Sequence, residues 1–126
     1  KMLAFDVSVP RSALPAFTDR VLRLLRRDYP FVRLCDYGHW GDGGSHLNLI
    51  WQESEVPDSA LLKAELQDQI YEIACCEFEG SFSAEHGVGP HNQRFYDRYV
   101  DPSVKALSGV LKTFCDPGDR LGTVRL

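Results

Sequence analysis

Segments in which apolar and polar residues alternate occur four times in the chain, and each predicts a half-buried β-strand. The first spans residues 3–9, the second and third are residues 31–35 and 47–51, and the fourth is centred on Phe82. The second and third flank a stretch made mostly of Gly, Asp and Ser. That composition is typical of a β-hairpin with a long loop.

Three longer segments carry apolar residues at every third or fourth position and predict helices. The first covers residues 12–28, and the second covers residues 58–80, with Gly80 as its C-cap. The third begins at Asp101-Pro102, where Asp is a favourable N-cap and Pro fits the first helical position. Its apolar face consists of Val104, Leu107, Leu111 and Phe114.

The order strand, helix, strand, strand, helix, strand predicts an α+β fold of the ferredoxin-like βαββαβ type. Such a fold has an antiparallel sheet with its helices on one face, and here a C-terminal helix follows it. With 126 residues, the chain has the length of a single domain, residues 1–126.

Two histidines, His39 and His46, stand at either side of the hairpin loop. If they face each other across the strands, Tyr37 lies opposite Asn48, and side-chain alternation sorts the hairpin into an apolar and a polar face. The polar face then holds Tyr37, His39, His46 and Asn48. Opposed side chains have Cβ atoms about 5 Å apart. Two imidazoles at that separation could share one metal ion, since zinc–nitrogen bonds are about 2.0–2.1 Å.

Glu85 is the candidate third ligand, because two imidazoles and one carboxylate form a catalytic type of metal set with an open coordination position. The alternative is a hairpin whose histidines bind nothing, and two histidines by themselves do not decide between these interpretations. Asp42 is explained by turn formation, because Asp bonds its own backbone in loops. His91 is interpreted as a surface loop residue.

Composition and charge exclude several classes of function. The net charge is −4 and basic residues cluster only on one predicted helix face, so no nucleic-acid partner is expected. No apolar stretch approaches 18 residues and no signal peptide opens the sequence, so no membrane span is expected. The four cysteines show no C-x-x-C spacing and are interpreted as reduced thiols of a cytoplasmic protein, buried as small hydrophobic residues.

Two segments carry a resemblance to a known family. Residues 38–48 read Gly-His-Trp-Gly-Asp-Gly-Gly-Ser-His-Leu-Asn, and residues 83–89 read Ser-Ala-Glu-His-Gly-Val-Gly. They resemble the two signature segments of the FAD-linked oxidase C-terminal domain, which occurs in glycolate oxidase catalytic subunits, D-lactate dehydrogenases and D-2-hydroxyglutarate dehydrogenases. The resemblance covers most of the chain. It departs, among other places, at Gly44-Ser45, where the family usually has Asn and an apolar residue, and at Asn92, where many members carry lysine.

The resemblance implies that His39, His46 and Glu85 bind a divalent cation, which would be zinc, manganese or iron. It also implies that His86 is the catalytic base for a small 2-hydroxy acid substrate, and imidazole titrates in the range that suits this task.

Asn48 and Tyr37 are candidates for binding the substrate carboxylate, although Tyr37 is equally well explained as a structural residue. The chain has no Gly-rich phosphate loop between a strand and a helix, so FAD is expected to be held by a domain upstream of Lys1, and the chain alone is expected to be inactive. Two other functions fit the same ligands: a metal-dependent hydrolase with a His2Glu site, and a non-catalytic metal-binding domain.

Overall fold

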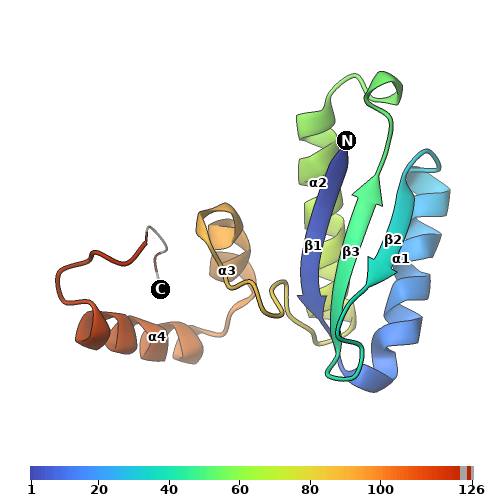
Figure 1. Ribbon diagram of the computed structural model, residues 1–126. Helices are drawn as coiled ribbons and strands as arrows, with labels where there is room; N and C mark the ends of the chain where they lie inside the picture. Colours follow the sequence, from blue (N-terminus) through green and yellow to red (C-terminus); the bar gives the residue numbers. More distant parts are fainter. Residues whose placement is uncertain (123–124, 126) are drawn as a thin grey trace. The chain divides into compact units, whose positions relative to one another are not determined.

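Three antiparallel strands in the order β1-β3-β2 form the sheet on which the first part of the chain is built (Figure 1). The strands are β1 (Met2–Ser8), β2 (Arg33–Tyr37) and β3 (Gly44–Ile50). The computed structural model describes residues 1–122 and 125, and these divide into two compact units, Lys1–Glu85 and His86–Leu126. The α+β class predicted from the sequence is confirmed.

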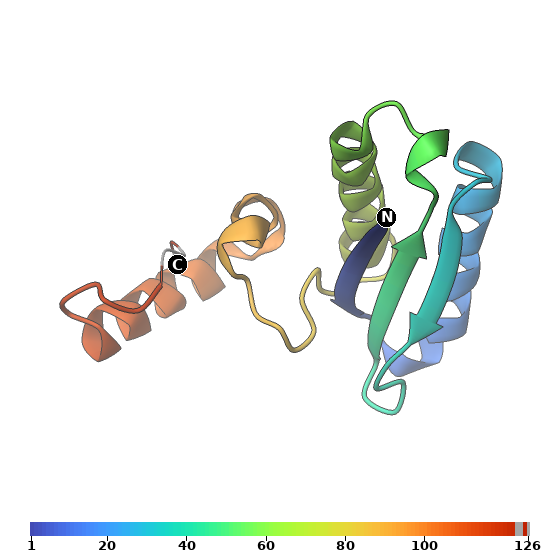
Figure 2. The same ribbon diagram turned by 45° about the horizontal axis from the view of Figure 1, so that its top comes forward.

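Helices α1 (Leu14–Asp28) and α2 (Ser59–Glu72) lie on the same face of this sheet, as the sequence predicted (Figures 1 and 2). They sandwich the core of the first unit against alternate strand residues, because side chains of a strand point to opposite faces. The largest fully buried apolar side chains of this core are those of Phe5, Val7, Phe17, Val21, Leu47, Leu49, Leu66 and Ile70. Asp58 caps α2 as predicted, its carboxylate accepting the N–H groups of Ala60 and Leu61.

The predicted fourth strand around Phe82 does not form in the described residues, so the full ferredoxin-like order is not seen. Ser81 makes one isolated antiparallel bridge with Ser8 on the free edge of β1. The next backbone bond runs from the Ala84 N–H to the Asp6 carbonyl, which is one residue out of step with that bridge. The local reason is that the Ser81 hydroxyl bonds the Ser83 backbone on both its N–H and its carbonyl, which bends the segment.

The register of the hairpin differs from the predicted one by two residues. Tyr37 pairs with His46, and Asn48 pairs with Cys35. β2 ends at Tyr37, so His39 lies in the loop rather than opposite His46, because its carbonyl closes the turn by accepting the N–H groups of Asp42 and Gly44. A shift by an even number of residues leaves every side chain on the face that alternation predicted.

Helix α2 ends earlier than predicted and continues as a π-helical segment, Ile73–Glu77. The residue in the left-handed conformation after it is Glu79, with φ of 53°, rather than Gly80. Glycine is required at position 80 for a different reason: a Cβ there would lie 2.2 Å from the Ser8 carbonyl oxygen. The glycine therefore allows the chain to cross the end of β1 at backbone contact distance.

The second unit contains α3 (Gln93–Tyr99) and α4 (Pro102–Cys115). The sequence did not predict α3, because its buried residues Phe95 and Tyr96 are adjacent and show no helical period. The predicted last helix is confirmed as α4, with the Asp101 side chain accepting the Ser103 N–H, but its apolar face is exposed, reaching 84% at Phe114. Every helix within residues 1–122 is too short or too polar to cross a bilayer.

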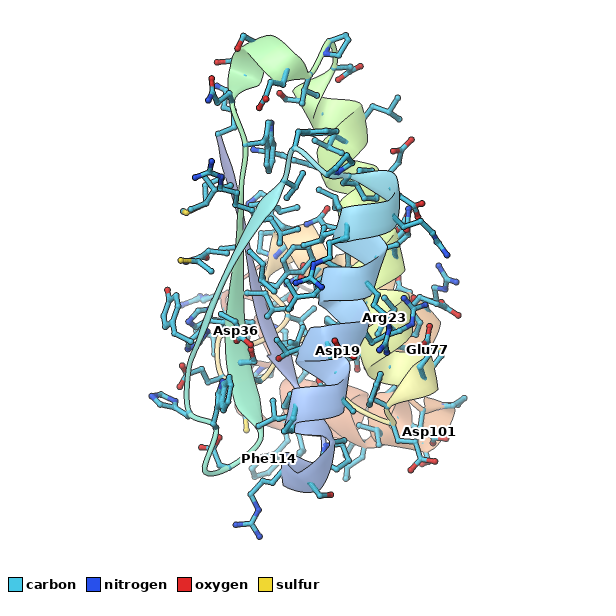
Figure 3. The ribbon with its side chains drawn as sticks, turned by 90° about the vertical axis from the view of Figure 1, so that its right-hand side faces the viewer. Asp19, Arg23, Asp36, Glu77, Asp101 and Phe114 are labelled. Atoms are coloured by element: carbon cyan, nitrogen blue, oxygen red, sulfur yellow. The ribbon has the colours of Figure 1, made fainter. Side chains whose placement is uncertain are left out.

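A polar network lies inside the first unit, between the sheet and α1. The Asp36 carboxylate of β2 accepts hydrogen bonds from Thr18 Oγ1 of α1 at 2.7 Å and from Ser45 Oγ of β3 at 2.6 Å. Figure 3 shows Asp36 on the side of the sheet that faces α1. Ser45 stands where the family usually has an apolar residue, and it is fully buried. Its hydroxyl is satisfied because it donates a hydrogen bond to Asp36.

Candidate metal and substrate site

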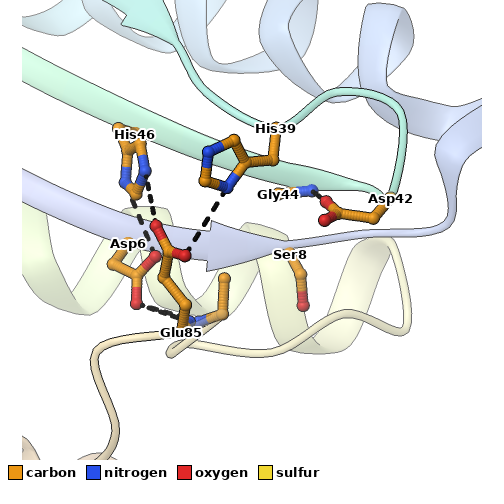
Figure 4. Close-up of a pocket in the computed structure, with 8 residues that line it drawn as sticks. Asp6, Ser8, His39, Asp42, Gly44, His46 and Glu85 are labelled. Carbon is orange, nitrogen blue, oxygen red and sulfur yellow. Dashed lines mark hydrogen bonds and ion pairs between the residues drawn. The ribbon is translucent and has the colours of Figure 1, made fainter.

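An open pocket of about 210 Å³ lies at the hairpin end of the sheet in the first unit. It is lined by Asp6 from β1, His39 and Asp42 from the hairpin loop, His46 from β3, and Glu85 (Figure 4). Two imidazoles and three carboxylates thus meet in one depression. Such a donor set matches the chemistry of a divalent cation site.

Glu85 brings the two histidines together. Its Oε1 lies 3.0 Å from His46 Nε2, and its Oε2 lies 3.5 Å from His39 Nδ1 (Figure 4). Ligands about 2.1 Å from a tetrahedral ion are themselves about 3.4 Å apart. The two separations of Glu85 from the histidines are of this size, and they are also those of ion pairs between a carboxylate and an imidazole. The rings of His39 and His46 are in edge-to-face contact, with centroids 5.9 Å apart.

The loop that carries His39 is held by its own backbone and by Asp42. The Asp42 carboxylate accepts the Gly44 N–H at 3.0 Å, which is the turn-forming role that the sequence indicated. Gly43 has φ of +97°, and a Cβ there would lie 2.3 Å from the Val9 carbonyl oxygen. Only glycine fits this contact, so it sets the path of the loop between His39 and His46.

His46 is the most enclosed of the predicted ligands, with its side chain only 17% exposed, while His39 and Glu85 are 65% and 47% exposed. Its second ring nitrogen, Nδ1, lies 3.5 Å from Asp6 Oδ1. Asp6 pairs directly with His46 in the β1–β3 ladder and is 9% exposed. Ligand atoms of Asp6, His46 and Glu85 lie within 4.8 Å of one another, and His39 is not part of this group.

Sequence reasoning missed Asp6. The alternation along β1 places it on the polar face, but only the pairing of β1 with β3 brings it to His46. That pairing joins residues forty positions apart in the sequence. The available signal was that Asp6 is the charged residue of β1.

The two candidate substrate ligands lie next to each other on the same face of the sheet as His46. The Asn48 amide donates a hydrogen bond to Tyr37 Oη at 3.2 Å, and the Tyr37 and His46 rings lie 5.4 Å apart. Tyr37 is 55% exposed, so its hydroxyl remains accessible from solvent. Neither residue lines the pocket itself.

His86, the predicted base, follows Glu85 directly in the sequence and is the first residue of the second unit. Its side chain is exposed. His91 lies in a short 3-10 turn, Pro90–Asn92, and is exposed, which agrees with its interpretation as a surface residue.

Comparison with known proteins places the chain in a family. Residues 1–124 match the profile of the family described as FAD linked oxidases, C-terminal domain. The chain belongs to this family. The match runs through both units and includes both motif segments, 38–48 and 83–89.

Several curated relatives are similar to this FAD-linked oxidase C-terminal domain. D-2-hydroxyglutarate dehydrogenase of Xanthomonas citri pv. viticola is 36% identical over 84 residues, which is 67% of the chain and 18% of that protein. Glycolate oxidase subunit GlcD of Escherichia coli (strain K12) is also 36% identical over 84 residues, or 67% of the chain and 16% of the subunit.

A putative mitochondrial D-lactate dehydrogenase of Schizosaccharomyces pombe is 30% identical over 124 residues, covering 90% of the chain and 22% of that protein. The chain thus spans less than a quarter of the length of each of these three relatives.

Proposed function

We propose that this chain is the substrate- and metal-binding C-terminal domain of a flavin-dependent D-2-hydroxy acid dehydrogenase or oxidase. The complete protein would oxidise a 2-hydroxy acid to a 2-oxo acid, with FAD held by a domain outside this chain. Relatives named for D-2-hydroxyglutarate, glycolate and D-lactate support this class of substrate. The family to which the chain belongs supports FAD as the cofactor.

One observation carries the metal part of the proposal: the Glu85 carboxylate lies 3.5 Å from a ring nitrogen of His39 and 3.0 Å from one of His46, which brings the three proposed donors together. Each donor comes from a different segment: the loop, β3 and the segment after Ser83. These three segments meet only when the first unit is folded. Local turn formation therefore does not explain why the three side chains lie together. His39, His46 and Glu85 would hold the cation.

Oxidation of a 2-hydroxy acid to a 2-oxo acid removes a proton from the 2-hydroxyl oxygen and a hydride from the carbon that bears this hydroxyl. When bound, FAD would supply the hydride acceptor and a divalent cation would supply positive charge beside the substrate oxygens. The residues of this chain bind and orient the substrate. Asn48 can donate its amide N–H to the substrate carboxylate, and the Tyr37 hydroxyl, which already accepts from Asn48, can donate its own proton.

His86 is proposed to take the hydroxyl proton on a neutral imidazole nitrogen. Glu85 is proposed to be a ligand rather than the base, because a carboxylate adds negative charge to a site that otherwise holds two neutral imidazoles, which suits a dication. A histidine bound to the cation would also lose the lone pair that a base needs.

The test uses the complete flavoprotein that contains this chain. D- and L-forms of lactate and 2-hydroxyglutarate, together with glycolate, are supplied as substrates, and reduction of an artificial electron acceptor is measured. We expect turnover with a D-2-hydroxy acid or glycolate, its loss on treatment with a chelator, and its return with zinc, manganese or iron.

The matched variants are His39→Ala, which should abolish turnover, and His91→Ala, which removes a histidine from a surface turn and should not. If no 2-hydroxy acid supports turnover and FAD is not bound, the proposal is wrong. Chelator-sensitive hydrolysis of an ester or amide would then favour the metal-dependent hydrolase.

A further inference from the structure

Asp6 is a buried carboxylate that lies outside both family motifs yet contacts the residues of each. It stands in the middle of β1, directly opposite His46 in the β1–β3 ladder, and is 9% exposed. A carboxylate is rarely this buried unless it is bound by donors. The function of Asp6 follows from which donors it has.

The two oxygens of Asp6 have separate tasks. Oδ2 accepts the backbone N–H groups of Ala84 at 3.1 Å and Glu85 at 2.9 Å. Oδ1 lies 3.5 Å from His46 Nδ1, a separation longer than that of an ordinary N–H···O hydrogen bond (Figure 4). The same side chain therefore holds the backbone from which Glu85 projects and faces one nitrogen of the His46 ring.

The two nitrogens of the His46 ring face different carboxylates. Nε2 lies 3.0 Å from Glu85 Oε1, on the side of the proposed cation, and Nδ1 faces Asp6. A neutral imidazole carries one proton, so a proton on Nδ1 directed at Asp6 leaves the lone pair of Nε2 available to a cation. Histidine ligands of metal ions usually donate their other N–H to a carboxylate in this way.

We propose that Asp6 is a positioning residue of the cation site: it fixes the Nδ1–H tautomer and ring orientation of His46 and anchors the backbone of Glu85. The inference rests on the metal part of the proposed function. Asp6 is close enough to His46 and Glu85 to be a ligand itself. However, one of its oxygens is occupied by two amides and the other faces Nδ1, away from the nitrogen that faces Glu85.

The first measurement needs no substitution. Nitrogen-15 chemical shifts of the His46 ring are recorded for the metal-free chain at about pH 8, where an ordinary histidine is neutral. We expect the proton on Nδ1. A proton held mainly on Nε2 would overturn the proposal, whatever the outcome of any variant.

The second measurement compares the zinc affinity of the chain with that of Asp6→Asn, by competition with a chromophoric chelator. The Asn side chain keeps the shape and one acceptor oxygen but loses the charge, and we expect zinc affinity to fall about 10–100-fold. Asp36→Asn is the matched control, because it removes a carboxylate with two hydrogen bonds from the opposite face of the sheet, and its zinc affinity should not change.

Two results from Asp6→Asn would overturn the proposal: unchanged zinc affinity in a folded variant, or complete loss of binding to the extent seen with His46→Ala, which would make Asp6 a ligand. If Asp6→Asn does not fold, the tautomer of the unsubstituted chain decides. If the unsubstituted chain takes up no zinc, the metal part of the proposed function fails, and the tautomer still decides on Asp6.

Discussion

Removal of the Asp36 carboxylate is expected to lower the free energy of unfolding of the chain. Asp36 accepts short hydrogen bonds from Thr18 and Ser45. A hydrogen bond to a charged group contributes about 1.5–3 kcal/mol, and the lower value is appropriate because Asp36 is half-buried. Asp36→Ala also leaves the fully buried Ser45 hydroxyl without its acceptor, which costs at least about 1 kcal/mol more.

The free energy of unfolding should therefore fall by about 4 kcal/mol in Asp36→Ala and by about 1.5 kcal/mol in Thr18→Val or Ser45→Ala. In Asp36→Ala/Ser45→Ala the loss should be no larger than in Asp36→Ala alone, because the second substitution removes the unsatisfied hydroxyl. Urea unfolding followed by circular dichroism measures all four values. Additive losses in the double variant, or a loss below about 0.5 kcal/mol in Asp36→Ala, would refute the reasoning.

Three further predictions concern the proposed site and the titratable groups. In the complete protein, His86→Ala should lose turnover on the order of 10²–10⁴-fold while still binding metal, whereas Glu85→Ala should lose turnover and metal together. A metal-free His86→Ala variant beside a metal-bound Glu85→Ala variant would exchange the two roles. The interpretation of the four cysteines as buried is wrong for Cys35, Cys76 and Cys115, which are exposed, while Cys75 is half-buried. Burial raises the pKa of the Cys75 thiol to about 11, so alkylation followed by mass spectrometry at pH 8 should label Cys75 last among the four cysteines, and equal labelling would contradict this. Hydrogen bonds from the Lys112 side chain and two backbone amides lower the pKa of Asp116 to about 2. The contribution of Asp116 to stability should therefore be complete above the ordinary carboxyl pKa of 3.8 and be lost as the pH falls through about 2, and an Asp116 carboxyl carbon resonance that titrates near 3.8 would show that the interaction is absent.

The face on which each strand residue lies was predictable from the sequence, because alternation along a strand has a period of two. This placed His46, Asn48 and Tyr37 together correctly. The register was wrong by two residues, since alternation is unchanged by an even shift and the loop closes through the His39 carbonyl. The motifs nevertheless predicted one candidate site with His39, His46 and Glu85. In the structure Glu85 contacts both histidines.

Features that depend on contacts between distant segments could not be predicted in the same way. Asp6 reaches His46 only through the β1–β3 ladder, and the segment near Phe82 forms one bridge instead of a strand because side-chain bonds of Ser81 compete with the ladder. The spacing of apolar residues in α4 correctly predicted a helix. The spacing alone does not predict whether the apolar face is buried or exposed, and here it is exposed.

The most direct test of the central claim is the metal content of the chain after reconstitution with zinc, manganese or iron and removal of unbound ions. Three converging ligands predict roughly one cation per chain by elemental analysis. The His39→Ala/His46→Ala variant should hold none, while His91→Ala should match the unsubstituted chain. Equal metal content in the double variant and the unsubstituted chain would contradict the assignment of His39, His46 and Glu85 as a metal site.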